Sequence, residues 1–346
     1  MKDFATFKTK SVVVVTPVYE DLEASSRLFV ELQNQFKGDV FIVAVDDGSV
    51  KNPLTATLFQ QTKPNIAGVI LKLRRNVGHQ RAIAIGLAYI SESLHDRQRV
   101  VVMDSDGEDL PSTISTLLEA TNNSETDVAV SHRKSRVETL KFKAFYMLYK
   151  AFFRLMTGRK ISFGNFMALT PQSVKRLVCM HELPIHIAGA VIASKLRITK
   201  CAIDRGPRYA GQSKMNFVGL ALHGFKALVI FAEDVLVRVG IGSALTAGLT
   251  VVGAITAIVL KSIGMSTPGW FSVALGLMML MFMQTGTLAL MTLMLTGTIR
   301  SGAVIDRSSY LNYIEAELTV STLKVKPRIN SKEEIHEKQF KNKSRK

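Results

Sequence analysis

Short apolar runs alternate with amphipathic segments along the N-terminal part of the chain. Runs of this length that are bounded by turn residues are typical of strands buried on both faces of a parallel sheet. The segments between them repeat their apolar residues at helical spacing. Strands are expected at residues 11–16, 40–45, 66–73, 99–103 and 127–131, and helices at residues 22–36, 79–93 and 111–121. This alternation predicts an α/β fold with a mostly parallel sheet and right-handed crossovers.

Two longer apolar stretches follow in the C-terminal part. Residues 241–260 and residues 269–299 contain no charged side chain, over 20 and 31 residues. A helix rises ~1.5 Å per residue and the hydrocarbon core of a bilayer is ~30 Å thick, so each stretch is long enough to span it. Helices buried in a soluble core are the alternative. Because only the eight residues 261–268 separate the two stretches, the pattern favours a transmembrane hairpin.

Lys and Arg residues near these stretches predict the orientation of the hairpin. The connector carries Lys261 alone, whereas the flanks carry Arg238, Arg300 and Arg307, and residues 324–346 hold nine more. Basic residues collect on the cytoplasmic side of a membrane. We therefore expect a multi-pass protein of the cell (inner) membrane, with the connector outside and with the N-terminal domain and both termini in the cytoplasm.

Composition narrows the class of protein further. Lys and Arg number 44 against 28 Asp and Glu, which gives a net charge of +16, and 47% of the residues are hydrophobic, which excludes a disordered chain. The positive charge fits a surface that binds anionic lipid, and the hairpin makes nucleic-acid binding the weaker alternative. Cys179 and Cys201 are too few for a disulfide framework or a four-thiolate zinc site. Residues 1–10 are polar and do not fit a secretory signal peptide.

Polar residues gather where the predicted strands end. In parallel sheets, ligands bind at the carboxyl ends of the strands, so these side chains form the candidate site. They are Pro17, Tyr19 and Glu20 after the first strand, Asp46 and Asp47 after the second, Asn76 after the third, and Asp104, Ser105, Asp106, Glu108 and Asp109 after the fourth.

The four carboxylates after the fourth strand fall within six residues. Hard oxygen ligands of this kind suit Mg²⁺ or Mn²⁺, which bridge to substrate phosphates. The alternative is a solvated acidic loop that caps the helix near Pro111. The Walker A pattern is absent, and Gly-x-Gly-x-x-Gly is absent after the first strand. These absences exclude a P-loop and disfavour an ordinary dinucleotide site.

The order of these motifs resembles the family 2 glycosyltransferases of GT-A fold. The motifs are Pro17-Val18-Tyr19-Glu20, Asp46-Asp47-Gly48-Ser49, Asn76-Val77-Gly78 and Asp104-Ser105-Asp106. With the C-terminal hairpin, the chain is similar to the polyprenyl-phosphate glycosyltransferases, the group of dolichol-phosphate mannose synthase and bactoprenol glucosyltransferase. The resemblance covers residues 11 to about 300 and implies a Rossmann-like GT-A domain in the cytosol plus two C-terminal transmembrane helices.

The resemblance also implies roles for the site residues. It assigns the nucleotide-sugar donor to Pro17, Tyr19, Glu20, Asp46, Asp47, Asn76, Asp104, Ser105 and Asp106, and to Arg205, Arg208, Ser213 and Lys214 of a basic loop that closes over the diphosphate. It assigns the divalent cation, Mg²⁺ or Mn²⁺, to Asp104, Asp106 and Glu108, where relatives often carry Gln at the last position. It assigns catalysis to Asp106, Asp109 and Arg133, with Arg133 near the acceptor phosphate.

Two positions depart from the family pattern. Relatives often carry Gly-Asp-Phe where this chain has Gly164-Asn165-Phe166, and more often Leu-Gln-Asp-Pro-Pro at residues 107–111. An Asn cannot act as a base. A phosphate monoester has a second pKa near ~6 and is largely ionised at neutral pH, so such an acceptor needs positioning and no general base. Asn165 therefore favours a phosphate acceptor over a hydroxyl.

Together these features predict a membrane-bound inverting glycosyltransferase that moves a sugar from a UDP- or GDP-sugar to a polyprenyl phosphate. The alternatives are a glycosyltransferase that acts on a hydroxyl in polysaccharide or glycolipid synthesis, and a non-catalytic membrane scaffold with a degenerate GT-A domain. The resemblance is also compatible with a homo-oligomer. The expected domains are a GT-A domain at 1–214, juxtamembrane amphipathic helices at 215–238, the hairpin at 239–300 and a basic cytosolic tail at 301–346.

Overall fold

The computed structural model describes residues 4–62, 64–132, 140–209, 217–265, 267, 269–300 and 307–319. These residues divide into two compact units. The sheet unit draws on residues 1–135, 163–214 and 305–346, and the helical unit draws on residues 136–162 and 215–304.

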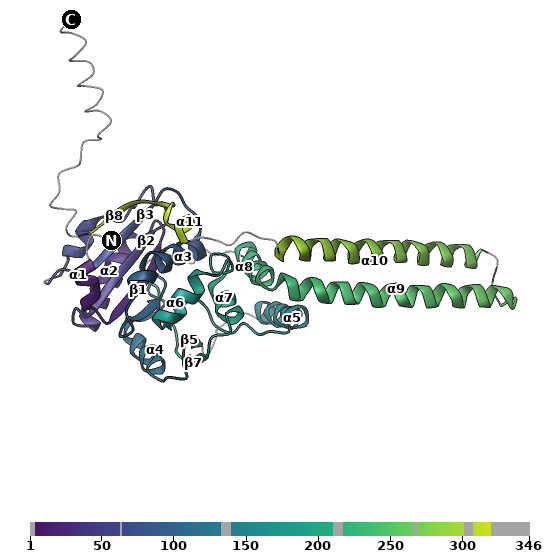
Figure 1. The fold of residues 1–346 in the computed structure, drawn as a ribbon, viewed down its shortest axis with the longest axis horizontal. Helices are drawn as coiled ribbons and strands as arrows, with labels where there is room; N and C mark the ends of the chain where they lie inside the picture. The colour runs from purple at the N-terminus through teal and green to yellow at the C-terminus, as the bar shows by residue number, and fades with distance from the viewer. Residues whose placement is uncertain are drawn as a thin grey trace, which may run out of the picture. The chain divides into compact units, whose positions relative to one another are not determined.

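An eight-stranded sheet forms the centre of the sheet unit, with the order β7-β5-β6-β4-β1-β2-β3-β8 (Figure 1). Its strands are β1 (Val12–Val18), β2 (Val40–Asp46), β3 (Gly68–Leu73), β4 (Arg99–Val102), β5 (Val128–His132), β6 (Met167–Leu169), β7 (Ile198–Ala202) and β8 (Ile314–Leu318). Strand β1 pairs in parallel with β2 and β4, β2 with β3, and β5 with β7. The predicted strands and the mostly parallel α/β sheet are confirmed.

Helices cover both faces of this sheet. They are α1 (Phe4–Thr9), α2 (Leu22–Gln35), α3 (His79–Ile90), α4 (Ile114–Thr121), α6 (Pro171–Val178), α7 (Ile187–Ala193) and α11 (Arg307–Leu311). Short 3₁₀ turns lie at η1 (Ala56–Gln60), η2 (Ser91–Ser93) and η3 (Pro111–Thr113). Because η3 leads directly into α4, the expected helix at 111–121 begins as a 3₁₀ turn at Pro111, which has no N–H to donate.

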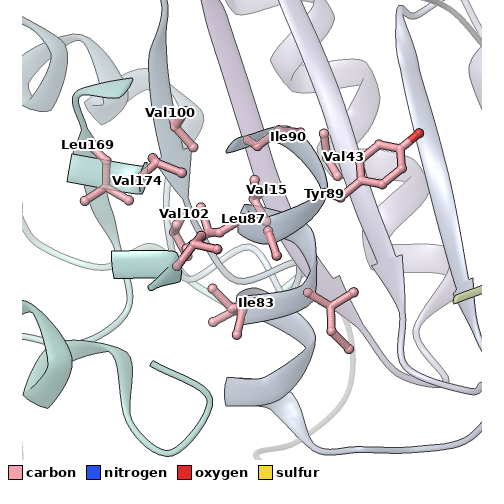
Figure 2. Packing of buried hydrophobic residues seen from close by; sticks show 14 of the residues in the cluster. Val15, Val43, Ile83, Leu87, Tyr89, Ile90, Val100, Val102, Leu169 and Val174 are labelled. Carbon is pink, nitrogen blue, oxygen red and sulfur yellow. The ribbon is translucent and has the colours of Figure 1, made fainter. Parts of the chain in front are cut away.

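Alternate residues of each strand enter different halves of the core, as the two-residue period of a strand requires. In β1, Val13 and Val15 join the cluster around α3 and α6, whereas Val12 and Val14 join the cluster around α2 and α4. Figure 2 shows the first cluster, in which Ile83 and Leu87 of α3 lie over the strands. Helix α3 comes so close to the sheet that a Cβ at Gly86 would lie 2.6 Å from Val15 Cγ1.

Two short antiparallel strands, β6 and β8, were not expected from the sequence. Strand β6 lies between β4 and β5, and its three residues are too few to give a hydropathy signal. Strand β8 pairs with the edge strand β3. It falls in the segment 301–346, where the pattern predicts a basic tail and no strand, because the partner that makes it a strand is remote in the sequence.

Hydrogen bonds outside the β3–β8 pairing also connect the segment that carries α11 and β8 to the rest of the sheet unit. The backbone N–H of Arg74 donates to Tyr313 O at 3.0 Å, and its Nε donates to Asn312 O at 3.2 Å. The hydroxyl of Tyr89, which Figure 2 shows on α3 beside Val43, donates to Glu317 Oε2 at 2.8 Å. The chain therefore returns to the sheet after its last long helix.

The hydrogen bond between Tyr89 and Glu317 should contribute measurably to the stability of the sheet unit. Tyr89 is 7% exposed, so replacing it with Phe removes a buried hydrogen bond at little cost in packing. We expect Tyr89→Phe to lower stability by about 1 kcal/mol, which is about 2–4 °C in Tm for a domain of this size. Thermal unfolding in detergent measures the shift. Tyr313→Phe, which keeps the ring beside Arg75, is the matched control, and equal Tm values for all three proteins would contradict the expectation.

The helical unit contains α5 (Leu140–Thr157), α8 (Phe217–Ile230), α9 (Ala232–Ser262) and α10 (Trp270–Arg300). Helices α9 and α10 lie side by side (Figure 1). Both Ala232–Ser262 and Trp270–Thr292 are long and apolar enough to cross a membrane. Large apolar side chains are exposed along both, and examples are Ile241, Leu245, Leu249, Ile255, Val273, Leu277, Met279 and Leu290. A surface of this kind is suited to lipid rather than to water.

Helix α5 packs against α8 and against the start of α9 inside the same unit. The hydroxyl of Tyr149 donates to Gly224 O at 3.0 Å, and the rings of Phe153 and Phe231 meet edge to face at 6.0 Å. Arg159 Nε lies 3.5 Å from Asp234 Oδ2, and its guanidinium lies over the Phe231 ring. The charged side chain of Asp234, in the first turn of α9, is therefore paired with Arg159.

Candidate active site

The carboxyl end of β2 is built by two aspartates that bind backbone amides. Asp46 is fully buried, and its Oδ1 and Oδ2 accept from the N–H groups of Ser49 at 3.0 Å and Leu54 at 2.9 Å. Both of its carboxylate oxygens therefore hold the turn that follows the strand. The contact of Asp46 with the donor stays a prediction.

Asp47 joins the ends of two neighbouring strands. Its Oδ1 accepts from Val77 N at 2.7 Å and its Oδ2 accepts from Gly78 N at 3.0 Å. Burial raises the pKa of the Asp47 carboxyl, and these two backbone bonds lower it in part. Gly48 makes the close approach feasible, because its φ is +72° and a Cβ there would lie 2.5 Å from Arg75 C and Asn76 N.

The residues after β1 face the same turn. Glu20 adopts φ +50°, and its carboxylate accepts from the backbone N–H groups of Val50, Lys51 and Asn52 at 2.6–3.1 Å. These bonds, led by the one from Val50, lower the pKa of Glu20. Tyr19 lies beside it and is 46% exposed. Pro17 is a buried residue of β1, and Asn76 is exposed.

The acidic loop after β4, residues 104–109, is tied together by its own hydrogen bonds. Asp109 is 3% exposed, and its Oδ2 accepts from Asp104 N at 3.0 Å. Asp106 Oδ1 accepts from Glu108 N at 3.1 Å, and Gly107 between them has φ +88°. Ser105 is buried. Burial and then the charge of Asp104 raise the pKa of Asp106.

Arg205 and Arg208, which the sequence assigned to a basic loop, form ion pairs with these carboxylates. Arg208 Nη2 is 3.0 Å from Asp106 Oδ2, and its Nε donates to Glu108 Oε1 at 2.8 Å. Arg205 pairs with Glu108 Oε2, and its Nε lies 3.9 Å from Asp109 Oδ1. Backbone bonds from Gly206 N to Glu108 O and from Tyr209 N to Asp106 O hold the two segments together. The sequence named both sets of residues, and the fold brings them into contact.

His79 and Asn165 lie beside these carboxylates. His79 Nε2 lies 3.2 Å from Asp104 Oδ1 and 2.8 Å from Asn165 Nδ2. Burial lowers the pKa of the His79 imidazole, but Asp104, Asp47 and Asp106 raise it by more, so the net shift is upward and the protonated, cationic ring is favoured. The available signal was its place directly after Asn76-Val77-Gly78.

The donor set fits a hard divalent cation. Asp104, Asp106 and Glu108 each expose about a fifth of their side chains, at 22%, 17% and 20%. Asp104 Oδ1 is buried 3.2 Å from His79 Nε2, and it is one of the carboxylate oxygens that could bind the cation. No three His, Cys, Asp or Glu side chains in the described part of the chain converge as a ready-made metal site. Mg²⁺-type sites need only one or two carboxylates, since waters and substrate phosphates supply the rest.

Three of the predicted site residues lie outside the described ranges. They are Arg133, Ser213 and Lys214. The remaining candidates lie at the carboxyl edge formed by β1, β2, β3 and β4, with Arg205 and Arg208 arriving from the segment after β7.

Comparison with known proteins agrees with this arrangement. Residues 13–176 match the model of glycosyl transferase family 2. An uncharacterized glycosyltransferase of Synechocystis is 28% identical over 60% of this chain and 65% of its own length. The undecaprenyl-phosphate 4-deoxy-4-formamido-L-arabinose transferase of Edwardsiella ictaluri is 26% identical over 64% and 67%. The chain thus spans about two thirds of the length of these curated relatives.

Among solved structures, glucosyl-3-phosphoglycerate synthase from Mycobacterium tuberculosis aligns with a TM-score of 0.46 and 14% identity, over 68% of this chain and 81% of that one. The family match covers β1 to β6 and includes the acidic loop. Residues 13–176, a little under half of the chain, therefore match a glycosyl transferase family 2 domain, and they lie on a Rossmann-like, mostly parallel sheet.

Proposed function

We propose that this protein is a glycosyltransferase that is anchored in the cell membrane and moves a sugar, with inversion, from a UDP- or GDP-sugar to a polyprenyl phosphate. The observation that carries the proposal is the acidic loop at the carboxyl edge of the sheet, with Arg205 and Arg208 laid against it. Relatives named for transfer to undecaprenyl phosphate support the choice of acceptor. The exposed apolar helices α9 and α10 support a lipid environment.

Donor binding is assigned to the strand ends. Tyr19 offers an exposed ring to the base, while Glu20, Asp46 and Asp47 fix the turns that shape the pocket beside Pro17, Asn76 and Ser105. Arg205 and Arg208 are fork-shaped donors suited to phosphate oxygens, and the proposed role of Ser213 and Lys214 is to add contacts to the diphosphate. Asp104, Asp106 and Glu108 would hold Mg²⁺ or Mn²⁺, which supplies charge compensation to the leaving nucleoside diphosphate.

Transfer then needs no base. An oxygen of the ionised lipid phosphate attacks the anomeric carbon in line, the bond from that carbon to the diphosphate breaks, and the configuration inverts. Asn165 agrees with this scheme because its amide cannot take a proton from a hydroxyl. The proposed role of Arg133 is to position the acceptor phosphate, and Asp106 lies on the donor side. Asp109 acts by holding the backbone of Asp104, as its hydrogen bond at 3.0 Å indicates.

The path of the chain supports the proposed topology. Strand β8 follows α10 in the sequence and pairs with β3 of the sheet unit. The sheet and β8 must lie on the same side of a membrane, so the chain has to cross it an even number of times between them. Helices α9 and α10 supply two crossings. The connector would then face outward and the glycosyltransferase domain the cytoplasm, as the Lys and Arg positions also predict.

Labelling of membranes with a panel of radioactive UDP- and GDP-sugars tests the proposal. We expect one donor to label a lipid fraction, in a reaction that needs a divalent cation and is abolished by EDTA. The product should release its sugar in mild acid, because a sugar–phosphate–lipid is acid labile. An acid-stable product would instead indicate a hydroxyl acceptor. Failure of every donor to label lipid would overturn the proposal in favour of a scaffold.

A further inference from the structure

The segment 205–209, which carries Arg205 and Arg208, is held beside the acidic loop by its backbone. Gly206 N donates to Glu108 O at 2.9 Å and Tyr209 N donates to Asp106 O at 2.8 Å, so the two segments run antiparallel. Both segments belong to the sheet unit. The two arginines therefore start from a backbone whose place is fixed at both ends.

The ring of Tyr209 lies directly on the acidic loop at Gly107. A Cβ at Gly107 would lie 2.5–2.7 Å from the ring atoms Cγ, Cδ1 and Cδ2, so a side chain at this position would displace the ring. Tyr209 is partly buried and also packs against the core cluster around α2 and α4. The ring thus fills the place that the glycine leaves open.

Helix α2 holds the other end of the same side chain. The Tyr209 hydroxyl donates to Glu31 Oε2, and the guanidinium carbon of Arg27 lies 4.3 Å from the centre of the ring. Arg27 Nε also donates to Glu31 Oε1 at 2.9 Å, which fixes the two α2 side chains relative to each other. Burial, and then the bond to Glu31, raise the pKa of the Tyr209 hydroxyl, so it keeps its proton and remains a donor.

The ion pairs of the two arginines hold the segment less firmly than this ring does. The side chains of Arg205 and Arg208 are 33% and 28% exposed, and ion pairs that water can reach contribute little to stability. A partly buried tyrosine contributes apolar area as well as a hydrogen bond. The guanidinium groups can therefore exchange carboxylates for phosphate oxygens while Tyr209 keeps the segment in place.

We propose that Tyr209 is a positioning residue for the nucleotide-sugar donor, because it holds Arg205 and Arg208 where the diphosphate binds. The proposal rests on the function given above and extends it to a side chain to which the sequence gives no role. Without the ring, the segment would occupy the binding-competent position for only part of the time, and the apparent affinity would fall by that fraction. A bound donor would still meet the same guanidinium groups, so the rate of the bound complex would change little.

Titration of the full-length protein in detergent with UDP and with GDP, each with Mn²⁺ present, tests the proposal. We expect Tyr209→Leu to raise the Kd of the nucleotide that the wild type binds by about 10-fold or more. Tyr209→Phe keeps the ring and loses the bond to Glu31, so it should raise the Kd by less. In the transfer assay the KM for the donor should rise in parallel, while kcat stays within about threefold of wild type.

Tyr89→Phe is the matched control, because it also removes a bond from a tyrosine hydroxyl to a glutamate. It should lower Tm and leave the Kd of the nucleotide unchanged. Hydrogen exchange of the ligand-free protein gives a second readout that does not depend on activity. The amides of Gly206 and Tyr209 should exchange faster in the Tyr209→Leu protein than in the wild type.

An unchanged Kd in Tyr209→Leu would overturn the inference, and so would unchanged exchange at residues 206–209. An equal loss of affinity in Tyr89→Phe would reveal a general effect of stability and overturn it as well. If Tyr209→Leu does not fold, a Kd for Tyr209→Phe equal to that of the wild type would overturn the inference. Nucleotide binding by a wild type that labels no lipid would instead overturn the proposed acceptor, and the Kd values would still decide the role of Tyr209.

Discussion

Asp106→Asn should lower the rate of sugar transfer by about a thousandfold. The change keeps the shape of the side chain and an oxygen to accept from Glu108 N, so the acidic loop should retain its fold. It removes the negative charge that faces Arg208 at 3.0 Å and that we assign to the divalent cation. Charge stabilisation by a bound cation is worth several kcal/mol, and ~1.36 kcal/mol corresponds to each tenfold change in rate.

The measurement is single-turnover transfer of labelled sugar into lipid by the purified protein. Glu119→Gln, which removes one charge from an exposed position on α4, is the matched control and should transfer at the wild-type rate. A rate within tenfold of wild type for Asp106→Asn would show that the acidic loop does not take part in the reaction.

The largest effect on stability is expected at Gly48. In Gly48→Ala the new Cβ would lie 2.5 Å from the backbone atoms Arg75 C and Asn76 N, and neither can move without breaking the bonds of Asp47 to Val77 and Gly78. The φ of +72° adds about 1–2 kcal/mol for a residue with a side chain, and the overlap adds about 1–3 kcal/mol. The total of about 2–5 kcal/mol corresponds to about 4–20 °C in Tm.

Gly78→Ala separates the two contributions to this loss. Gly78 has φ +90°, but a Cβ there meets nothing within 4 Å. Gly78→Ala should therefore lose only the part of the stability that comes from the positive φ, without the part that comes from steric overlap. Thermal unfolding of both variants in detergent measures the difference. If Gly48→Ala unfolds at the same temperature as Gly78→Ala, the close packing of the two strand ends does not limit stability.

Much of the fold could be predicted because it follows from local patterns. The valines of residues 12–15 and the apolar run at residues 40–45 are buried on both sides in any parallel sheet, and they became β1 and β2. The uncharged stretches became α9 and α10 for the same reason, since length and polarity alone decide them. Strands β6 and β8 were not predicted, because their pairing partners are distant and their own sequences are short.

In the candidate site, too, the sequence indicates residues, and the structure adds their contacts. Asp104, Asp106 and Glu108 could be named from their spacing after a strand, but the sequence does not show that Arg208 bonds Glu108 across 100 positions. Nor does the sequence show that the oxygens of Asp46 and Asp47, which it names as ligand contacts, accept hydrogen bonds from backbone N–H groups of the neighbouring turns.

By itself, the sequence determined the strands β1 to β5, the helices between them and the helices suited to lipid, because each depends on the period and polarity of neighbouring residues. Only the tertiary structure decided which side-chain hydrogen bonds join distant segments. Gln80 meets Asn165 across 85 positions and Ile187 across 107. Such bonds depend on distances between segments that the fold alone brings together.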